Sequence, residues 1–288
     1  MRTVRIGLAA ALLTATAPLS AQSIVGPPKK GEPARIATIP TPEKFFGFQM
    51  GADKKMAHWA DMVSYYDQLG RLSPRMKVVN MGKTSEGRPF YALFISSPAN
   101  LAKLEYYKGI NAKIADPRGL SDDSLEALSR NGKAVVLQSM SMHSTEIGGS
   151  QMAVELVYDL VSRQDAETQR ILDNVIAIMI PSFNPDGEVM VTEWYRKYLG
   201  TKYEGSAMPY LYHHYVGHDN NRDWYMLTQV ETRNMHNAVY HDWHPQFWLD
   251  EHQMGFAAGE LVAHVNYMIV EGRLTAETKD GVLQFRTT

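Results

Sequence analysis

His143 and Glu146 are the first residues of this sequence whose types and spacing could do chemistry. They lie three positions apart in the segment HSTE, so an imidazole nitrogen and a carboxylate oxygen can turn toward one cation. Zinc binds both kinds of atom at about 2.0–2.2 Å, and catalytic zinc sites commonly combine two His with one carboxylate. The competing interpretation is a hydrogen-bonded loop His, with Glu146 stabilising the N-terminus of a helix.

His252 is the third candidate ligand, in the segment LDEHQMG. The neighbouring Asp250 and Glu251 could orient its ring, because a bound His usually donates its other nitrogen to an outer acceptor. Taken alone, His252 is more typical of a satisfied loop His than of a metal ligand. The chain has no Cys, which excludes cysteine-ligated zinc, disulfides and thiol nucleophiles, so a transition-metal site must use His and carboxylates.

Two further segments carry residues suited to a carboxylate or a carbonyl oxygen. In GHDNNRDW, the planar guanidinium of Arg222 matches a carboxylate in bidentate fashion, with the amide of Asn221 beside it. In WYRK, Arg196 could stabilise negative charge that develops on a carbonyl oxygen. The plainer interpretations are an Asx-rich turn and a surface cation. The preceding NPDG, residues 184–187, is predicted to be a turn.

Other His in the chain offer a weaker alternative metal site. They form two groups, which are His213, His214 and His218, and His241 and His244 with Asp242. Both groups lie in polar, loop-like sequence, without a buried strand directly before them. We therefore favour the set of His143, Glu146 and His252.

The elements that must position these residues alternate between strand and helix. Apolar runs predict buried strands at residues 134–140 and 175–180 and a third strand at 246–249, with a helix over residues 150–162. The candidate ligands follow the first and third of these strands directly. Because ligand crevices of open α/β sheets lie at the carboxyl ends of strands, we expect these segments to meet at one edge of the sheet.

The rest of the chain shows helical and strand-like periodicity on both sides of this region. It predicts helices at residues 52–69, 101–114, 121–129 and 231–240, and strands at 75–81 and 90–96 joined through the turn segment GKTSEGRP.

The net charge and the N-terminal sequence indicate which partners the protein can bind and where it works. A net charge of -2 over 288 residues gives no case for a nucleic-acid or anionic-membrane partner, and no apolar stretch is long enough to span a membrane.

Arg2 and Arg5, followed by a short apolar run, predict a signal peptide over residues 1–21 and export to a periplasm or to the cell exterior. Residues 22–42, rich in Pro, Gly and Lys, are predicted to be a linker or an extended arm.

Considered jointly, the motifs resemble the M14 family of zinc carboxypeptidases. The order HSTE, NPDG, WYRK, NNRDW and then a His after a strand is the order of that family, and GKTSEGRP is similar to its early hairpin. The resemblance runs from about Pro42 to Gly255 and is greatest to large bacterial exported members. It implies an α/β domain over residues 43–288, with a mixed central β-sheet and helices on both faces.

The resemblance also implies a metal and a role for the basic residue of WYRK. The family's zinc ligands are matched by His143, Glu146 and His252, so Zn²⁺ is the expected cofactor. Arg196 matches the arginine that polarises the scissile carbonyl.

Asn221 and Arg222 match the pair that holds the C-terminal carboxylate of the substrate in this family. The expected activity is zinc-dependent hydrolysis at the C-terminal end of a peptide or peptide-like substrate with a free carboxylate. The same metal site would serve an amidase acting on peptidoglycan stem peptides or acyl-amino acids. It would also serve a binding module that keeps zinc without turnover. The sequence does not indicate an oligomeric state.

The family's general base, a glutamate on a strand well after the last ligand, has no match in this sequence. The tail after His252 contains Glu260, Glu271, Glu277 and Tyr267, none in a context similar to the family. We therefore expect the chain to be the front part of a longer enzyme, truncated or frame-shifted near Gly255. Lost strands would leave sheet edges and apolar surface uncovered.

Overall fold

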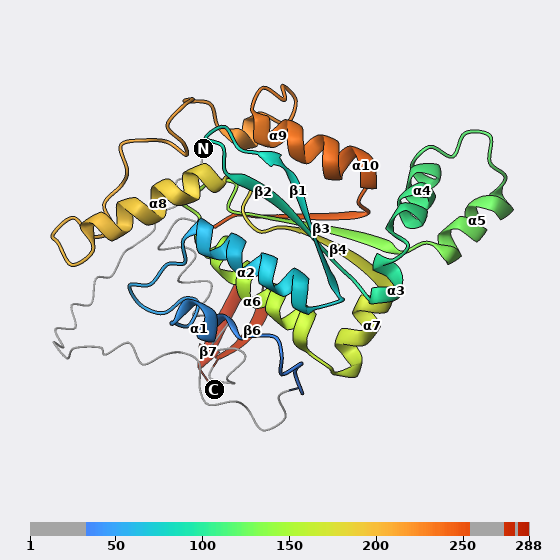
Figure 1. The fold of residues 1–288 in the computed structure, drawn as a ribbon, viewed down its shortest axis with the longest axis horizontal. Coiled ribbons are helices and arrows are strands. Elements are labelled where there is room, and N and C mark those ends of the chain that lie inside the picture. The colour runs from blue at the N-terminus through green and yellow to red at the C-terminus, as the bar shows by residue number, and fades with distance from the viewer. Residues whose placement is uncertain (1–32, 254–273, 280–281, 288) are drawn as a thin grey trace. The chain divides into compact units, whose positions relative to one another are not determined.

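The computed structural model describes residues 33–253, 274–279 and 282–287 (Figure 1). The predicted signal peptide and the first part of the predicted linker lie outside these residues. So do Gly255 and three of the tail residues considered above, which are Glu260, Tyr267 and Glu271. The remaining tail residue, Glu277, lies on a strand of a two-stranded hairpin formed by β6 (Leu274–Lys279) and β7 (Val282–Thr287).

A five-stranded mixed sheet forms the centre of the described domain (Figure 1). Its strands are β1 (Met76–Lys83), β2 (Pro89–Ile95), β3 (Ala134–Met140), β4 (Val175–Ile180) and β5 (Phe247–Glu251), in the order β1-β2-β4-β3-β5. Strand β3 runs parallel to β4 and to β5, whereas β2 runs antiparallel to β1 and to β4. Each strand predicted from sequence is present, and the mixed α/β sheet is confirmed.

The helices surround this sheet and differ widely in length. They are α1 (Pro42–Phe46), α2 (Trp59–Leu72), α3 (Pro98–Leu101), α4 (Leu104–Ala115), α5 (Asp122–Asn131), α6 (Gly148–Ser162), α7 (Ala166–Asn174), α8 (Pro185–Tyr198), α9 (Val230–Met235) and α10 (His241–Trp243). A 3₁₀ turn, Asn220–Arg222, and a π-helical turn, His236–Tyr240, complete the list. Among the described residues, no helix is both long and apolar enough to cross a membrane.

Two apolar cores lie on opposite faces of the sheet. Strand β2 contributes Leu93 to one core and Phe94 to the other, since alternate strand residues point to opposite faces. Helices α2 and α6 pack on the first face, and α4 with the α9–α10 segment packs on the second (Figure 1). Helices therefore cover both faces, as expected.

The prediction that residues 184–187 form only a turn is wrong. These residues begin α8, a helix that we did not predict. Asn184 caps the helix by accepting a hydrogen bond from the Gly187 amide at 2.9 Å, and Pro185 occupies the first turn, where its missing N–H costs nothing. The motif is thus a helix N-terminus whose turn-forming residues hide the start of the helical pattern.

Candidate metal centre

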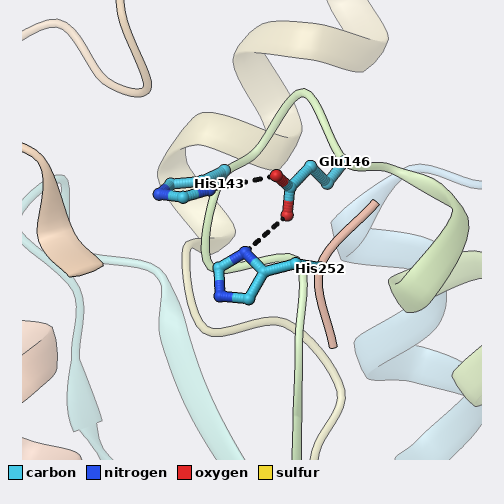
Figure 2. Close-up of side chains that lie close together, drawn as sticks. All are labelled: His143, Glu146 and His252. Atoms are coloured by element: carbon cyan, nitrogen blue, oxygen red, sulfur yellow. Dashed lines mark hydrogen bonds and ion pairs between the residues drawn. The ribbon is translucent and has the colours of Figure 1, made fainter. Parts of the chain in front are cut away.

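Glu146 lies between the two His side chains that were predicted to be its fellow ligands (Figure 2). Its Oε1 lies 3.0 Å from Nδ1 of His143, and its Oε2 lies 2.9 Å from Nδ1 of His252. One ligand atom from each of the three residues falls within 4.8 Å of the others. Two imidazole nitrogens and a carboxylate oxygen are a donor set that suits zinc, so the residues present fit that ion.

An outer carboxylate holds the second nitrogen of each ring. Nε2 of His143 lies 3.0 Å from Asp219, and Nε2 of His252 lies 3.0 Å from Asp250. A ring that donates its Nε2–H to a carboxylate presents Nδ1 as a lone-pair donor, which is the protonation state that a metal ligand requires. Both rings are therefore oriented in the same sense, with Nδ1 toward Glu146.

Asp219 is a functional candidate that the sequence did not reveal. It precedes the NNR motif and is 76 residues from His143 along the chain, so spacing alone cannot connect them. Its Oδ1 also accepts the amide N–H of Asn221 at 2.8 Å, which fixes the 3₁₀ turn beside the ligands. Asp250 was expected as a partner of His252. Its neighbour Glu251 was the other expectation, but adjacent strand residues point to opposite sides, and Asp250 makes the contact.

The charges around His252 change its proton affinity. Partial burial lowers the pKa of His252, but the negative charges of Asp250 and Glu146 outweigh this effect, and the net pKa is raised above its ordinary value. A proton on this ring therefore competes with a metal ion up to a higher pH than on an ordinary His.

The loop that carries His143 and Glu146 is closed by local hydrogen bonds. The Glu146 amide donates to the carbonyl oxygen of His143 at 2.8 Å, which forms a tight turn. Ser141, just after β3, has φ +50°. Its hydroxyl donates to the Glu146 carbonyl oxygen and accepts the Ser150 amide at the start of α6. The strained Ser141 backbone thus joins the strand end, the ligand turn and the helix.

The first turn of α8 packs against the loop that carries the candidate ligands. A Cβ on Gly187 would lie 2.1 Å from the Tyr212 carbonyl oxygen and 2.5 Å from Cβ of Ser144, so no side chain fits there. The same carbonyl oxygen accepts hydrogen bonds from Asn184 and Ser144, both at 3.0 Å. The ring of Tyr212 stacks on His143 with its centroid 4.4 Å away. NPDG therefore packs directly behind the candidate ligands.

The remaining residue of NPDG ties a distant hairpin to the same support. Asp186 is buried and accepts hydrogen bonds from Thr84, from the Glu86 amide and from Arg88, at 2.6, 2.9 and 2.7 Å. These three residues belong to GKTSEGRP, the turn between β1 and β2. Two motifs that the sequence showed separately thus form one structural unit.

Asn221 and Arg222 lie beside the ligand set. The amide nitrogen of Asn221 lies 3.4 Å from Nε2 of His252. The guanidinium of Arg222 is exposed, and within the described chain its hydrogen bond is a long one, 3.4 Å to the Asn221 carbonyl oxygen. The guanidinium donors of Arg222 are therefore available to an anion.

Arg196 lies apart from the three candidate ligands. Its guanidinium is exposed and donates to the Met56 carbonyl oxygen at 3.2 Å. It follows Asn184 by twelve residues on α8, which corresponds to about 18 Å along a helix. No contact in the described chain joins it to the ligands.

The other His groups do not converge on one point in the described chain. His213 is buried against the ring of Tyr215, whereas the neighbouring His214 reaches Glu86 at 3.0 Å. Asp242 of the second group forms an ion pair with Lys108. Within the residues that the structure describes, the group of His and acidic side chains close enough to hold a metal comprises His143, Glu146 and His252.

Comparison with known sequences finds one family. The family model described as zinc carboxypeptidase matches residues 62–268, which is most of the chain. The match begins inside α2. It ends thirteen residues beyond Gly255, the position at which the resemblance of the motifs ends. No curated protein matches the sequence.

Solved structures similar to this chain include two carboxypeptidases. Carboxypeptidase A from Helicoverpa armigera is 18% identical with a TM-score of 0.44, over 70% of this chain and 47% of its own. A metallo-carboxypeptidase from Burkholderia cenocepacia is 20% identical with a TM-score of 0.45, over 68% of this chain and 40% of its own. The chain thus spans less than half the length of either structure.

Proposed function

Because this chain belongs to the M14 family of zinc carboxypeptidases, we propose that it carries the zinc-binding and carboxylate-binding part of a peptidase that removes C-terminal residues from peptides. The observation that carries the proposal is the convergence of His143, Glu146 and His252, with both ring Nδ1 atoms directed at one carboxylate. These distances support a metal centre of two His and one Glu.

Each residue of the centre has a separate task in this proposal. The ion would be held by Nδ1 of His143, Nδ1 of His252 and the Glu146 carboxylate. Asp219 and Asp250 accept the Nε2–H of the two rings, and so keep both Nδ1 atoms directed inward. Zinc held in this way supplies polarisation of a carbonyl and acidification of a water molecule.

Asn221 and Arg222 bind the terminal carboxylate of the substrate. The exposed guanidinium of Arg222 offers paired N–H donors that match a carboxylate in bidentate fashion, and the side-chain amide of the preceding Asn221 lies next to His252. Family membership supports a role for Arg196 at the scissile carbonyl. To serve there, its guanidinium must leave the Met56 carbonyl oxygen.

Hydrolysis of a peptide by water would also require a group that accepts a proton. Among the described residues, the outer carboxylates that contact the two His rings are Asp219 and Asp250, and both are engaged with ring nitrogens. Binding of zinc and of a carboxylate-terminated peptide is therefore the more direct test of this chain, and turnover is measured beside it. We also propose that the protein works outside the cytoplasm, which the sequence of residues 1–21 supports.

Titration of the purified chain with zinc against a chelator tests the metal centre. We expect one zinc ion per chain, and we expect Glu146→Ala to reduce zinc affinity by at least 100-fold, because it removes the only carboxylate ligand. Glu126→Ala, which removes an exposed Glu on α5 paired with Arg130, is the matched control and leaves affinity unchanged. Unaltered zinc binding by Glu146→Ala would exclude the proposed centre.

Peptide binding tests the second half of the proposal. A blocked dipeptide with a free carboxylate should bind the zinc-loaded chain at least about 10-fold more tightly than the same dipeptide with a C-terminal amide. Arg222→Gln should remove that difference, whereas Arg118→Gln, an exposed Arg distant in sequence, should preserve it. Zinc-dependent hydrolysis supports the peptidase, and binding without hydrolysis supports the binding module instead.

A further inference from the structure

Glu188, in the first turn of α8, places an ionisable group in the interior of the fold. Its side chain is completely buried, and within the described chain neither carboxyl oxygen has a hydrogen-bond partner. A buried carboxylate without a neighbouring positive charge is strongly unfavourable, so such a group keeps its proton. The proposed metal centre does not use this residue.

The polar neighbours of this carboxyl come from three other segments. Tyr66 lies on α2, Ser150 lies on α6 and Ser182 follows β4. Burial raises the pKa of Glu188 to about 7, although the hydroxyls of Ser182 and Ser150 lower it in part. Burial, and then the negative charge of Glu188, raise the pKa of Tyr66, which is the titratable group that faces it. Among the described residues, no positive charge contributes to the pKa of Glu188.

Two of these neighbours are themselves unpaired. The hydroxyls of Tyr66 and Ser182 are buried and have no hydrogen-bond partner in the part of the chain that the structure describes. Buried polar groups are nearly always paired, so a carboxyl and two hydroxyls in this state are exceptional. An uncharged carboxyl can both donate and accept hydrogen bonds, whereas a carboxylate can only accept them. The uncharged form of Glu188 therefore suits this interior better than the charged form.

Ser150 connects Glu188 to the loop that carries two of the candidate ligands. Its hydroxyl donates to the carbonyl oxygen of Ile147 at 3.0 Å, and Ile147 directly follows Glu146. Its amide donates to the hydroxyl of Ser141, which in turn donates to the Glu146 carbonyl oxygen at 2.8 Å. A change beside Ser150 therefore reaches the turn of Glu146 through two hydrogen-bonded routes.

Ser182 connects Glu188 to the other end of the same loop. The residue after it, Phe183, donates its amide N–H to the carbonyl oxygen of Met140 at 2.7 Å. Met140 is the last residue of β3, where the ligand loop begins. Gly187, which directly precedes Glu188, has no room for a side chain against this loop. The loop is therefore packed closely on the helix turn that carries the buried acid.

We propose that Glu188 is a positioning residue, which supports the loop of His143 and Glu146 as an uncharged acid and loosens that loop when it ionises. It acts through Ser150 and Ser182, which hold the two ends of the loop. The inference rests on the proposed function, because the loop matters as the carrier of two metal ligands.

The direction of the pH dependence follows from the raised pKa. In the unfolded chain Glu188 has an ordinary pKa of 4.5, so between this pH and about 7 the folded state binds a proton that the unfolded state has released. The stabilising contribution of this proton is fully present below pH 4.5 and is lost as the pH rises through about 7. The protein should therefore unfold more easily above neutral pH.

Urea unfolding of the full chain at several pH values tests this expectation. Glu188→Gln keeps the shape of the side chain and removes its charge. Between about pH 5 and pH 8.5, the unfolding equilibrium constant of the wild type should rise roughly 30–100-fold relative to that of Glu188→Gln. Glu193→Gln, at an exposed Glu on the same helix, is the matched control and should keep the wild-type profile.

Two spectroscopic measurements separate a positioning role from a general effect on stability. Infrared difference spectra between the wild type and Glu188→Gln should show a protonated carboxyl at about pH 6 and none at pH 8.5. At pH 8.5, the amides of Glu146 and Ser150 should exchange with deuterium at least about 5-fold faster in the wild type than in Glu188→Gln. If Glu188→Gln does not fold, NMR titration of wild-type chain labelled with ¹³C at Glu carboxyls gives the pKa directly.

The outcomes separate this inference from the proposed function. Identical unfolding profiles in the wild type and Glu188→Gln, or a carboxylate at position 188 at about pH 6, would refute the uncharged acid while zinc binding remains intact. Equal exchange of the two loop amides would refute the positioning role. Absence of zinc binding at every pH would instead overturn the proposed function, and would leave the titration of Glu188 unchanged.

Discussion

Both candidate His ligands lie between two carboxylates, with Glu146 shared and one outer Asp for each ring. This arrangement determines which nitrogen can bind a metal. An outer carboxylate that accepts Nε2–H selects the tautomer with a lone pair on Nδ1 and raises the basicity of the ring. The centre therefore depends on Asp219 and Asp250 as well as on the ligands themselves.

Asp219 is expected to be important for metal affinity although it is not a ligand. Asp219→Ala should reduce zinc affinity by about 10–100-fold, because the ring of His143 loses the acceptor that orients it. Chelator competition measures the change, and Asp116→Ala, at an exposed Asp paired with Arg118, is the control. Full zinc affinity in Asp219→Ala would show that Tyr212 stacking alone orients His143.

The raised pKa of His252 predicts a pH dependence of metal binding. Zinc competes with the proton on this ring, so apparent affinity is constant above the pKa and falls by about tenfold per pH unit below it. Because the pKa is raised, the fall begins at a higher pH than for an ordinary His. Asp250→Asn removes a negative charge that raises this pKa, and should move the onset to lower pH. An onset at the same pH in both proteins would refute the assignment.

At the scale of elements, the first turn of α8 is the part that most directly supports the metal centre. It combines a cap at Asn184, an anchor to the β1–β2 hairpin at Asp186 and a close backbone approach at Gly187. Each of these three contacts requires a different residue type. The motif NPDG therefore acts as one structural unit. Its helical start was missed because Asn, Pro and Gly are also the usual residues of turns.

Gly187→Ala should destabilise the fold. The added methyl group would meet the Tyr212 carbonyl oxygen and Ser144, so the ligand loop must shift at a cost of about 1–3 kcal/mol or more. Urea unfolding monitored by circular dichroism measures the loss. Gly109→Ala on α4 is the matched control, because a Cβ there meets nothing within 4 Å and should stabilise the helix by up to about 1 kcal/mol. Equal stability of the two variants would contradict the close packing.

At the scale of the whole described domain, the candidate metal centre joins an edge strand to the centre of the sheet. Strand β5 pairs with β3 on one side, and it leaves Phe247 and Leu249 56% and 38% exposed. His252 follows β5, whereas His143 and Glu146 follow β3. A metal bound by all three would therefore fasten the end of β5 to the neighbouring strand.

Zinc should accordingly stabilise the chain against heat. At a free concentration 100 times the dissociation constant, binding to the folded state alone adds about 2.7 kcal/mol, which corresponds to a rise in Tm of roughly 5–10 °C for a domain of this size. Differential scanning fluorimetry measures the shift, and Glu146→Ala should show none. A similar rise in that variant would place the stabilising zinc elsewhere.

The amino-acid sequence by itself determined the elements of the sheet and the types of residue at the site. The continuous apolar run of β4 and the apolar run that begins β3 specify buried strands, and this signal is local. His143 and Glu146 could be selected because they follow such a strand, and His252 because it follows another predicted strand of the sheet. The resemblance to the family has the same local origin, since it rests on short motifs in a set order.

Only the tertiary structure decided how these parts meet. It placed Asp219 on His143, buried Asp186 under the hairpin and made NPDG the start of a helix. It also kept Arg196 on the Met56 carbonyl oxygen, so the predicted role of Arg196 remains a prediction. Local periodicity contains no information on contacts between residues that are far apart in the chain. Those contacts depend on the register of the strands and on how the loops pack, and both are set by the fold as a whole.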